Sequence, residues 1–300
     1  MNFALKLQLL FLIIIFLAGC HSVSEKKVNN NILTDDLQRE VSVNIPASVI
    51  SLVPSITEIL YAIGAESTIL AVSQACSYPP EVKNKNVVTT YPAIDYESIY
   101  RIKPDLVLVS TEIFQQDIIH RFEELSIPVF FLAFHDKNDI FKAIKKLGEI
   151  TGNDSKALQI SDSLKNLLNS FISVHNHSTH PRTLILVSND PLIAVGKNSF
   201  ISDLLTISGG NNIIDFDSPD AYPQVSREFI LKADPEIILM PGGKKSINKI
   251  FYTFPELSKT KAYLNKSVIG IQSEAFVRPS TRFVEVIKEL HEYLYNEKKN

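Results

Sequence analysis

The chain has 300 residues, of which 45% are hydrophobic and 21% charged, and its formal net charge is −3. Such a balance excludes a bulk attraction to nucleic acid and leaves enough apolar residues for a sizeable core. About 250 residues beyond an N-terminal leader and tether allow one large or two small domains.

The first twenty residues predict export. Lys6 precedes an apolar run over residues 9–18, which is too short for a spanning helix of about 20 residues but suits a signal sequence. The run ends in Leu17-Ala18-Gly19-Cys20, which resembles the lipobox of bacterial lipoproteins and implies cleavage that leaves Cys20 lipidated. The alternative is an ordinary signal peptide with an incidental cysteine. We expect a leader over 1–20, a flexible tether over 21–46, and an exported protein anchored to an envelope membrane.

Apolar strands alternate with helices in a first lobe, expected over 47–150. The strands are expected at 49–53, 68–72, 87–88, 106–109 and 129–132, and the helices from Ser55 to Gly64, around Glu97, and at 117–125 and 137–148. Strands that are apolar throughout predict a mostly parallel sheet covered on both faces. Glu58 completes a capping box with Ser55, which explains it without a functional role.

A helix of about 20 residues, or about 30 Å, is predicted from Ser155 to Val174 by the spacing of its apolar residues. It lies within an expected linker over 151–181 and would join two lobes stiffly. The histidines that follow are His175, His177 and His180. Two of them could share a metal, but no carboxylate or cysteine stands nearby, so a solvated loop is favoured and no metal site is predicted.

One pattern occurs twice, 131 residues apart. Tyr91-Pro92, Glu97 and Pro104-Asp105 recur as Tyr222-Pro223, Glu228 and Pro235-Glu236. In each copy a proline-bearing loop precedes a short helix and a buried strand, which predicts two similar lobes. The second lobe, expected over 182–300, adds strands at 183–187 and 267–272, helices at 198–207 and 280–295, and a mobile turn at 241–245.

These elements predict an α/β protein with two similar lobes, each with a mostly parallel sheet, joined by one long α-helix and enclosing a ligand cleft. The common phosphate, nucleophile-elbow and zinc-protease signatures are absent, so we predict a binding protein and no enzyme. An exported enzyme remains a weaker alternative, because Glu274 has no visible catalytic partner. Cys76 is interpreted as a small, partly buried apolar residue, and no internal disulfide is expected.

Several segments resemble periplasmic cobalamin-binding proteins of ABC-type uptake systems. They are Val49–Gly64, Tyr78-Pro79-Pro80, Tyr91–Val109 and the run Tyr222-Pro223-Gln224-Val225-Ser226-Arg227-Glu228. The resemblance covers about residues 47–295 and places the chain in the helical-backbone class of solute-binding proteins, which also serves ferric siderophores and haem. It implies a monomer that captures cobalamin or another metal chelate and delivers it to an ABC permease dimer, with no resident cofactor.

The resemblance also implies roles for particular residues. Glu97 and Glu228 would dock the two lobes to the permease, although each also fits a helix-capping role beside Asp95 or Ser226. Ligand contacts are implied for Ala75, Tyr91, Tyr222, Glu274, Ala275, Phe276, Val277 and Arg278. Tyr91 and Tyr222 would face each other across the cleft, whereas Phe276 has a core role as its alternative.

The chain departs from the family at several ligand positions. It has no tryptophan, and Ala75 and Ser110 stand where cleft aromatics are expected. A haem or ferric siderophore is therefore the alternative ligand. An arginine-rich cleft would favour an anionic siderophore, and Arg278 and Arg282 are the obvious candidates.

Overall fold

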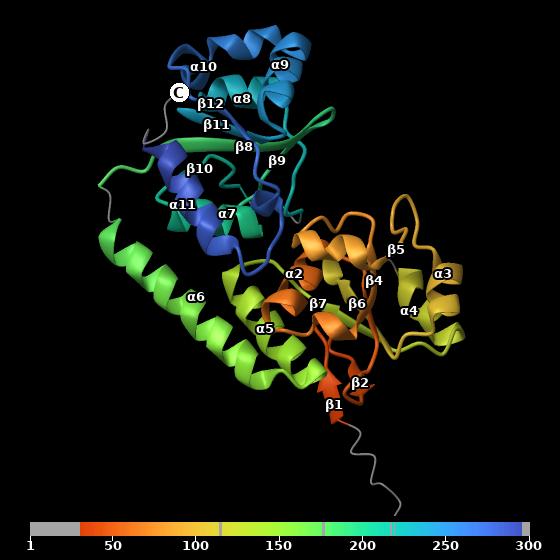
Figure 1. Cartoon of the computed structure of the whole chain (residues 1–300). Coiled ribbons are helices and arrows are strands. Elements are labelled where there is room, and N and C mark those ends of the chain that lie inside the picture. The colour runs from red at the N-terminus through yellow and green to blue at the C-terminus, as the bar shows by residue number, and fades with distance from the viewer. Residues whose placement is uncertain (1–30, 114–115, 176–177, 217, 219, 296–300) are drawn as a thin grey trace, which may run out of the picture.

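The computed structural model describes residues 31–113, 116–175, 178–216, 218 and 220–295. It has two α/β lobes joined by one long helix, α6 (Asp154–Val174), which runs along one side of the molecule (Figure 1). The predicted fold class is confirmed in these features. The α6 helix begins one residue before the predicted start and ends at the predicted residue, and it buries Ala157, Leu164, Leu168 and Phe171.

The N-terminal lobe is built on one five-stranded parallel sheet, as its apolar strands predicted. The order is β5 (Asn86–Val88), β4 (Ile69–Ser73), β3 (Val49–Ser51), β6 (Leu106–Ser110) and β7 (Val129–Leu132). Side chains of one strand alternate between two cores: Leu106 and Leu108 join one apolar cluster, and Val107 and Val109 join another. The sheet is therefore covered on both faces.

Four helices cover this sheet: α2 (Pro54–Ala62), α3 (Tyr96–Ile102), α4 (Gln116–Glu124) and α5 (Lys137–Thr151). The α5 helix begins after Asp136, whose side chain accepts hydrogen bonds from the Asn138 and Asp139 amides. It ends at Gly152, which adopts a left-handed conformation with φ of 72°.

The expected tether over 21–46 is corrected by the structure for its described part. Strands β1 (Asn31–Thr34) and β2 (Glu40–Val43) form an antiparallel hairpin. Asp35 in its turn is fully buried and accepts hydrogen bonds from the Leu37 and Arg39 amides and from the Arg39 guanidinium. Arg39 also donates to the Val129 carbonyl, so the hairpin is fixed to the lobe. The sequence did not predict this hairpin, because the segment is short and rich in polar residues and its structure depends on tertiary contacts with the lobe.

The C-terminal lobe has a second sheet in the order β10 (Asn211–Asn212), β8 (Arg182–Asn189), β11 (Ile237–Pro241) and β12 (Val268–Ile271), all parallel, with β9 (Leu192–Ala194) antiparallel to β8. Its helices are α7 (Phe200–Ile207), α8 (Arg227–Ala233), α9 (Gly243–Thr253), α10 (Lys261–Leu264) and α11 (Phe283–Leu294).

The expectation of a mobile turn at 241–245 is wrong, because the helix α9 begins within it. Gly242 and Gly243 have positive φ values of 90° and 64°. A Cβ atom on Gly270 of β12 would lie 2.4 Å from the Gly243 carbonyl carbon. The glycines therefore allow a close approach between helix and strand and do not indicate mobility.

The repeat is confirmed in its backbone detail. Lys103 and Asp234 end the helices α3 and α8 in the left-handed conformation. Asp105 then accepts a hydrogen bond from the Ser48 amide, and Glu236 accepts one from the Arg182 amide. Each acidic residue thus ties its own strand to the neighbouring strand in the same way.

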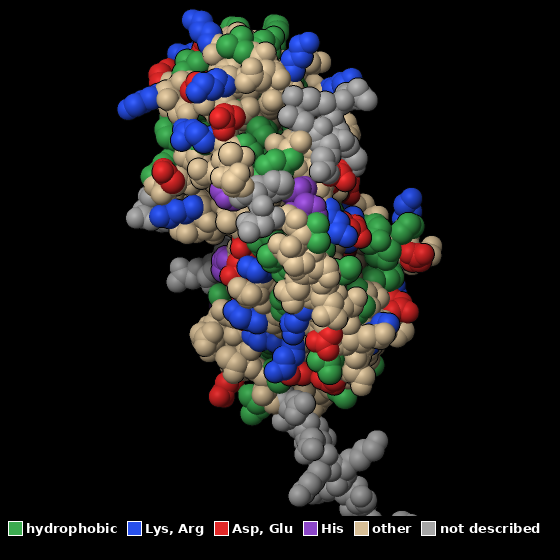
Figure 2. Space-filling view, turned by 90° about the vertical axis from the view of Figure 1, so that its left-hand side faces the viewer, with side chains coloured by type: hydrophobic (Ala, Val, Ile, Leu, Met, Phe, Trp, Pro, Cys, Tyr) green, Lys and Arg blue, Asp and Glu red, His purple; other side chains and the backbone are tan. Residues whose placement is uncertain are grey.

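The surface shows charges of both signs. In Figure 2 basic and acidic side chains are interspersed over the face turned to the viewer, which offers no large single-sign patch. Among the described residues, no helix combines the length and the apolar character needed to cross a membrane.

Asp35→Ala should lower the free energy of unfolding by about 3 kcal/mol, because it leaves the Arg39 guanidinium without its buried partner. Urea denaturation would measure the difference. The matched control is Asp162→Ala, whose side chain on α6 is 59% exposed and should cost less than about 0.5 kcal/mol. Equal stability of the two variants would show that the hairpin is not a structural part of the lobe.

Candidate ligand-binding site

The carboxyl ends of the strands from both sheets lead into loops that touch each other. Because ligands of parallel sheets bind beyond the carboxyl ends of the strands, this contact is the candidate ligand-binding site. We call it the lobe junction: residues 74–78 after β4, residues 273–282 after β12, and the side chains that bond to them.

Three hydrogen bonds join the two loops. The Ser77 hydroxyl donates to Glu274 Oε2 at 2.5 Å, and Arg278 Nη1 donates to Ser77 Oγ at 2.7 Å. Arg278 Nη2 donates to the Ala75 carbonyl oxygen at 3.1 Å and lies 2.9 Å from Glu274 Oε2. The loop that carries the predicted ligand residues 274–278 is therefore held against Ala75, which is also a predicted ligand residue. The Ser77 hydrogen bond, and then the charge of Arg278, lower the pKa of Glu274.

Glu58 lies at the centre of this junction, and its interpretation as a helix cap is wrong. The residue before α2 is Val53, and no side chain caps the helix. Glu58 is buried, and its carboxylate accepts hydrogen bonds from Arg282 Nε at 2.9 Å and Arg282 Nη2 at 2.6 Å. The Ser280 hydroxyl also donates to Glu58 Oε2 at 2.6 Å. Glu58 thus has the spacing of a capping-box residue but makes a contact between the lobes. The local sequence pattern does not indicate that contact.

Arg278 and Arg282 are both part of this ion-pair network. Arg278 Nη1 lies 3.6 Å from Glu58 Oε1. The guanidinium of Arg282 stacks 4.0 Å from the centroid of the Tyr78 ring. Each arginine therefore faces a carboxylate and groups of the opposite lobe.

Tyr91 and Tyr222 are presented differently. Tyr91 is 81% exposed, and its loop is fixed by Gln74, whose Oε1 accepts a hydrogen bond from the Thr90 amide at 2.7 Å. Tyr222 is 42% exposed and lies on a segment bonded along β9, with the Ala194 amide donating to the Pro223 carbonyl oxygen. The structure records no contact between the two rings, so their expected opposition stays a prediction.

Glu112 lies outside the lobe junction as defined above, and the sequence did not single it out. It follows β6, and its carboxylate accepts a hydrogen bond from the Phe134 amide at 3.0 Å. Although its side chain is reachable by solvent, burial of the carboxylate by surrounding protein raises its pKa. Burial and the charge of Glu112 together raise the pKa of the Tyr222 phenol. The phenol of one lobe thus responds to the charge of a carboxylate in the other, and the position of Glu112 after a parallel strand was the available signal.

The loop after β12 divides into buried and accessible residues. Ala275 and Phe276 are 3% and 1% exposed and belong to the core, so the core alternative holds for Phe276. Val277 is 47% exposed, and the Glu274 side chain is 62% exposed. The surface that this loop offers to a ligand therefore comes from Glu274 and Val277, with Arg278 mostly covered.

Glu97 and Glu228 occupy the first turns of the equivalent helices α3 and α8. Their side chains are 80% and 70% exposed. The caps are Asp95 and Ser226, which accept hydrogen bonds from the Ser98 and Phe229 amides. Because other residues cap these helices, both glutamates are available at the surface. The hydrogen bond from Arg227 lowers the pKa of Glu228.

No group of metal-ligating residues gathers in the part of the chain that is described. His177 lies outside the described residues. His175 stacks on Phe171, and His180 Nδ1 lies 2.9 Å from the Gly209 carbonyl oxygen. Cys76 is half-buried against the core, 3.3 Å from the Thr57 hydroxyl, which confirms its interpretation as a packing residue.

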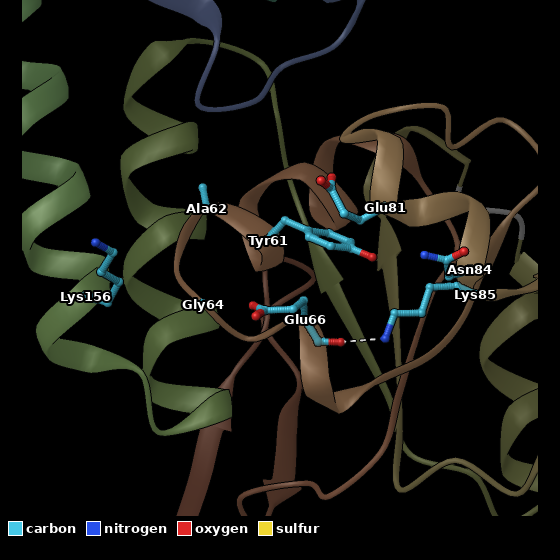
Figure 3. Close-up of a pocket in the computed structure, with 8 residues that line it drawn as sticks. All are labelled: Tyr61, Ala62, Gly64, Glu66, Glu81, Asn84, Lys85 and Lys156. Carbon is cyan, nitrogen blue, oxygen red and sulfur yellow. Dashed lines mark hydrogen bonds between the residues drawn. The ribbon is translucent and has the colours of Figure 1, made fainter.

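A separate groove of about 530 Å³ lies on the N-terminal lobe (Figure 3). Tyr61 lies between the acidic side chains of Glu66 and Glu81, and Lys85 Nζ donates to the Glu66 carbonyl oxygen at 2.7 Å. None of the predicted ligand residues lines this groove. It is therefore distinct from the lobe junction.

Comparison with known proteins identifies the class. A family model described as "Periplasmic binding protein" matches residues 49–275, so the chain belongs to the periplasmic binding protein family. The vitamin B12-binding protein of Yersinia pestis (strain Pestoides F) is 28% identical over 243 residues, covering 81% of this chain and 84% of the relative.

Solved structures agree on the fold. The periplasmic vitamin B12-binding protein BtuF of Vibrio cholerae has a TM-score of 0.74 at 23% identity, covering 85% of this chain and 99% of that chain. A periplasmic haem-binding protein from Pseudomonas aeruginosa has a TM-score of 0.76 at 20% identity, covering 85% and 94%. The resemblance noted in the sequence is thus confirmed at the level of the periplasmic binding protein family and its two-lobed fold.

Glu112→Gln should lower the pKa of the Tyr222 phenol, because it removes a nearby negative charge, while the part of the shift due to burial remains. An NMR titration of the tyrosine ring carbons, with Tyr222→Phe for assignment, would measure it. Asp117→Asn, whose charge instead raises the pKa of Tyr96, is the control. An unchanged pKa of Tyr222 in Glu112→Gln would show that the two groups do not interact electrostatically in solution.

Proposed function

We propose that this chain is the substrate-binding lipoprotein of an ABC importer and that it captures cobalamin or a related corrinoid. The observation that carries the choice of ligand is the charge at the lobe junction. Arg278 and Arg282 are both paired with carboxylates, those of Glu58 and Glu274. An anionic chelate therefore finds no uncompensated cation among these residues.

A corrinoid suits the remaining surface. Its amide fringe offers N–H donors, and Glu112 and Glu274 are acceptors from opposite lobes. Tyr91, Tyr222 and Val277 offer accessible apolar area for a broad ring. The name of the Yersinia relative supports the same choice. Haem, by contrast, carries two propionates, and some ferric siderophores are anionic; guanidinium groups are strong partners for such carboxylates.

Calorimetric titration of the mature domain with cyanocobalamin, haemin and a ferric hydroxamate tests the ligand. We expect cyanocobalamin to bind, and Tyr222→Ala to weaken it by about 1 to 3 kcal/mol through loss of a partly buried aromatic contact. The control is Tyr252→Ala on α9, where the tyrosine is 88% exposed. Binding of haemin or the hydroxamate in place of cyanocobalamin would reassign the ligand within the same class.

We also propose that Glu97 and Glu228 dock the two lobes to a permease dimer. Equivalent carboxylates in the two copies suit a partner with twofold symmetry. Both are exposed and neither is needed as a helix cap, as described above.

The double variant Glu97→Gln, Glu228→Gln should abolish uptake of labelled cyanocobalamin by cells while leaving the affinity of the purified protein unchanged. Glu124→Gln with Glu285→Gln removes one charge from each lobe elsewhere and should transport normally. Wild-type uptake by the first double variant would contradict docking through these residues.

Cys20 is proposed to carry the lipid anchor, which lies outside the described residues. More than one acyl chain gives stable membrane attachment, whereas a single chain is marginal. Cys20→Ala should therefore move the protein from the membrane fraction to the soluble fraction. Equal membrane retention of variant and wild type would exclude the anchor.

A further inference from the structure

We infer that Glu58 determines ligand specificity by neutralising the two arginines of the lobe junction, and thereby prevents the site from binding anionic chelates. The inference rests on the proposed function, because it explains why a site with two arginines would accept a neutral ligand. It assigns to Glu58 the role of a positioning residue that acts through Arg278 and Arg282.

The geometry supports neutralisation of both cations. The Glu58 side chain is 1% exposed, and those of Arg278 and Arg282 are 14% and 18% exposed. Two hydrogen bonds from Arg282 and one from Ser280 satisfy the carboxylate, and Arg278 lies 3.6 Å away. A charge pair this well covered is screened much less by salt than a surface pair.

The ion pairs of Glu58 with Arg278 and Arg282 also connect the two lobes. Glu58 lies on α2 of the N-terminal lobe, whereas the arginines lie between β12 and α11 of the C-terminal lobe. The arginines belong to the loop that also bears Glu274 and Val277, the residues with accessible surface. A charge released by loss of Glu58 would therefore appear beside the proposed ligand and not in a remote part of the protein.

An uncompensated guanidinium pair has a defined chemical preference. Guanidinium groups bind carboxylates through two parallel hydrogen bonds, and Arg282 already uses this arrangement with Glu58. A ligand carboxylate, such as a haem propionate, could pair with the released guanidinium from its solvent-accessible side, since the side chains of Arg278 and Arg282 are 14% and 18% exposed. Glu274 would still compensate one arginine, so Glu58→Gln leaves about one net positive charge for the ligand.

The test is titration of wild type, Glu58→Gln and Glu285→Gln with haemin and with cyanocobalamin. We expect Glu58→Gln to bind haemin about tenfold or more tightly than wild type, because it leaves a junction arginine without a compensating carboxylate. Glu285 lies near Arg282 but is exposed on α11, so its variant makes the same change in net charge without opening the pair. It should show no gain.

A second variant isolates the arginine. Adding Arg282→Gln to Glu58→Gln should abolish the gain in haemin affinity, because the released cation is removed. No gain in Glu58→Gln, or a gain that persists without Arg282, would overturn the inference. A merely structural role would lower stability without changing the preference between the two ligands.

Loss of the buried carboxylate will also lower stability. If Glu58→Gln is unfolded in ordinary buffer, thermal unfolding is measured with added citrate. Citrate should then raise the unfolding midpoint of Glu58→Gln more than that of wild type, by binding the arginine that Glu58 no longer compensates. Equal citrate effects on the two proteins would overturn the inference.

The two proposals fail separately. If wild type binds cyanocobalamin but Glu58→Gln gains no anion affinity, the function stands and the role of Glu58 fails. If wild type binds no cyanocobalamin while Glu58→Gln gains haemin affinity, the corrinoid assignment fails and Glu58 still controls anion binding.

Discussion

The two lobes share one apolar cluster, and the geometry of the lobe junction depends on it. Ile56 of α2 and Ile140 of α5 belong to the same cluster as Leu204 of α7 and Phe283 of α11. Phe141 and Phe283 meet edge to face across it, with ring centroids 5.7 Å apart. Parting the lobes would expose this surface to water at about 25 cal/mol per Å², so packing opposes a wide hinge motion.

Polar contacts fix the orientation of the two lobes, which the apolar cluster alone does not determine. Lys137 of α5 bonds to Asp203 of α7 through both its amide and its ammonium group. Glu58 and the two arginines form the second such contact. Apolar packing is non-directional, whereas these hydrogen-bonded charges require defined positions. The long helix α6 is therefore one of several elements that join the lobes.

The sequence predicted features that depend on local periodicity. The apolar runs placed the parallel strands, the spacing of Leu164, Leu168 and Phe171 placed α6, and the repeat placed Glu97 and Glu228 on equivalent helices. These signals are short-range in the sequence and can be recognised without knowledge of the tertiary fold.

Features that depend on distant partners were not predictable in this way. Glu58 fits a capping box by its spacing, but its partners lie more than 200 residues away in the chain. Asp35 and Glu112 likewise acquire their roles from contacts with Val129–Leu132 or the loop beyond it. Tertiary contacts overrode the local interpretation at each of these positions.

The hairpin at the N-terminus also shortens the segment between the folded lobe and Cys20, the proposed site of the lipid anchor. Only eleven peptide bonds separate Cys20 from Asn31, where β1 begins, so fully extended they span about 40 Å. With the proposed anchor in place, a lobe joined to it by so few residues would sample only a small volume above the bilayer. Its effective concentration toward a permease in the same membrane would then be set by tether length and not by expression level alone.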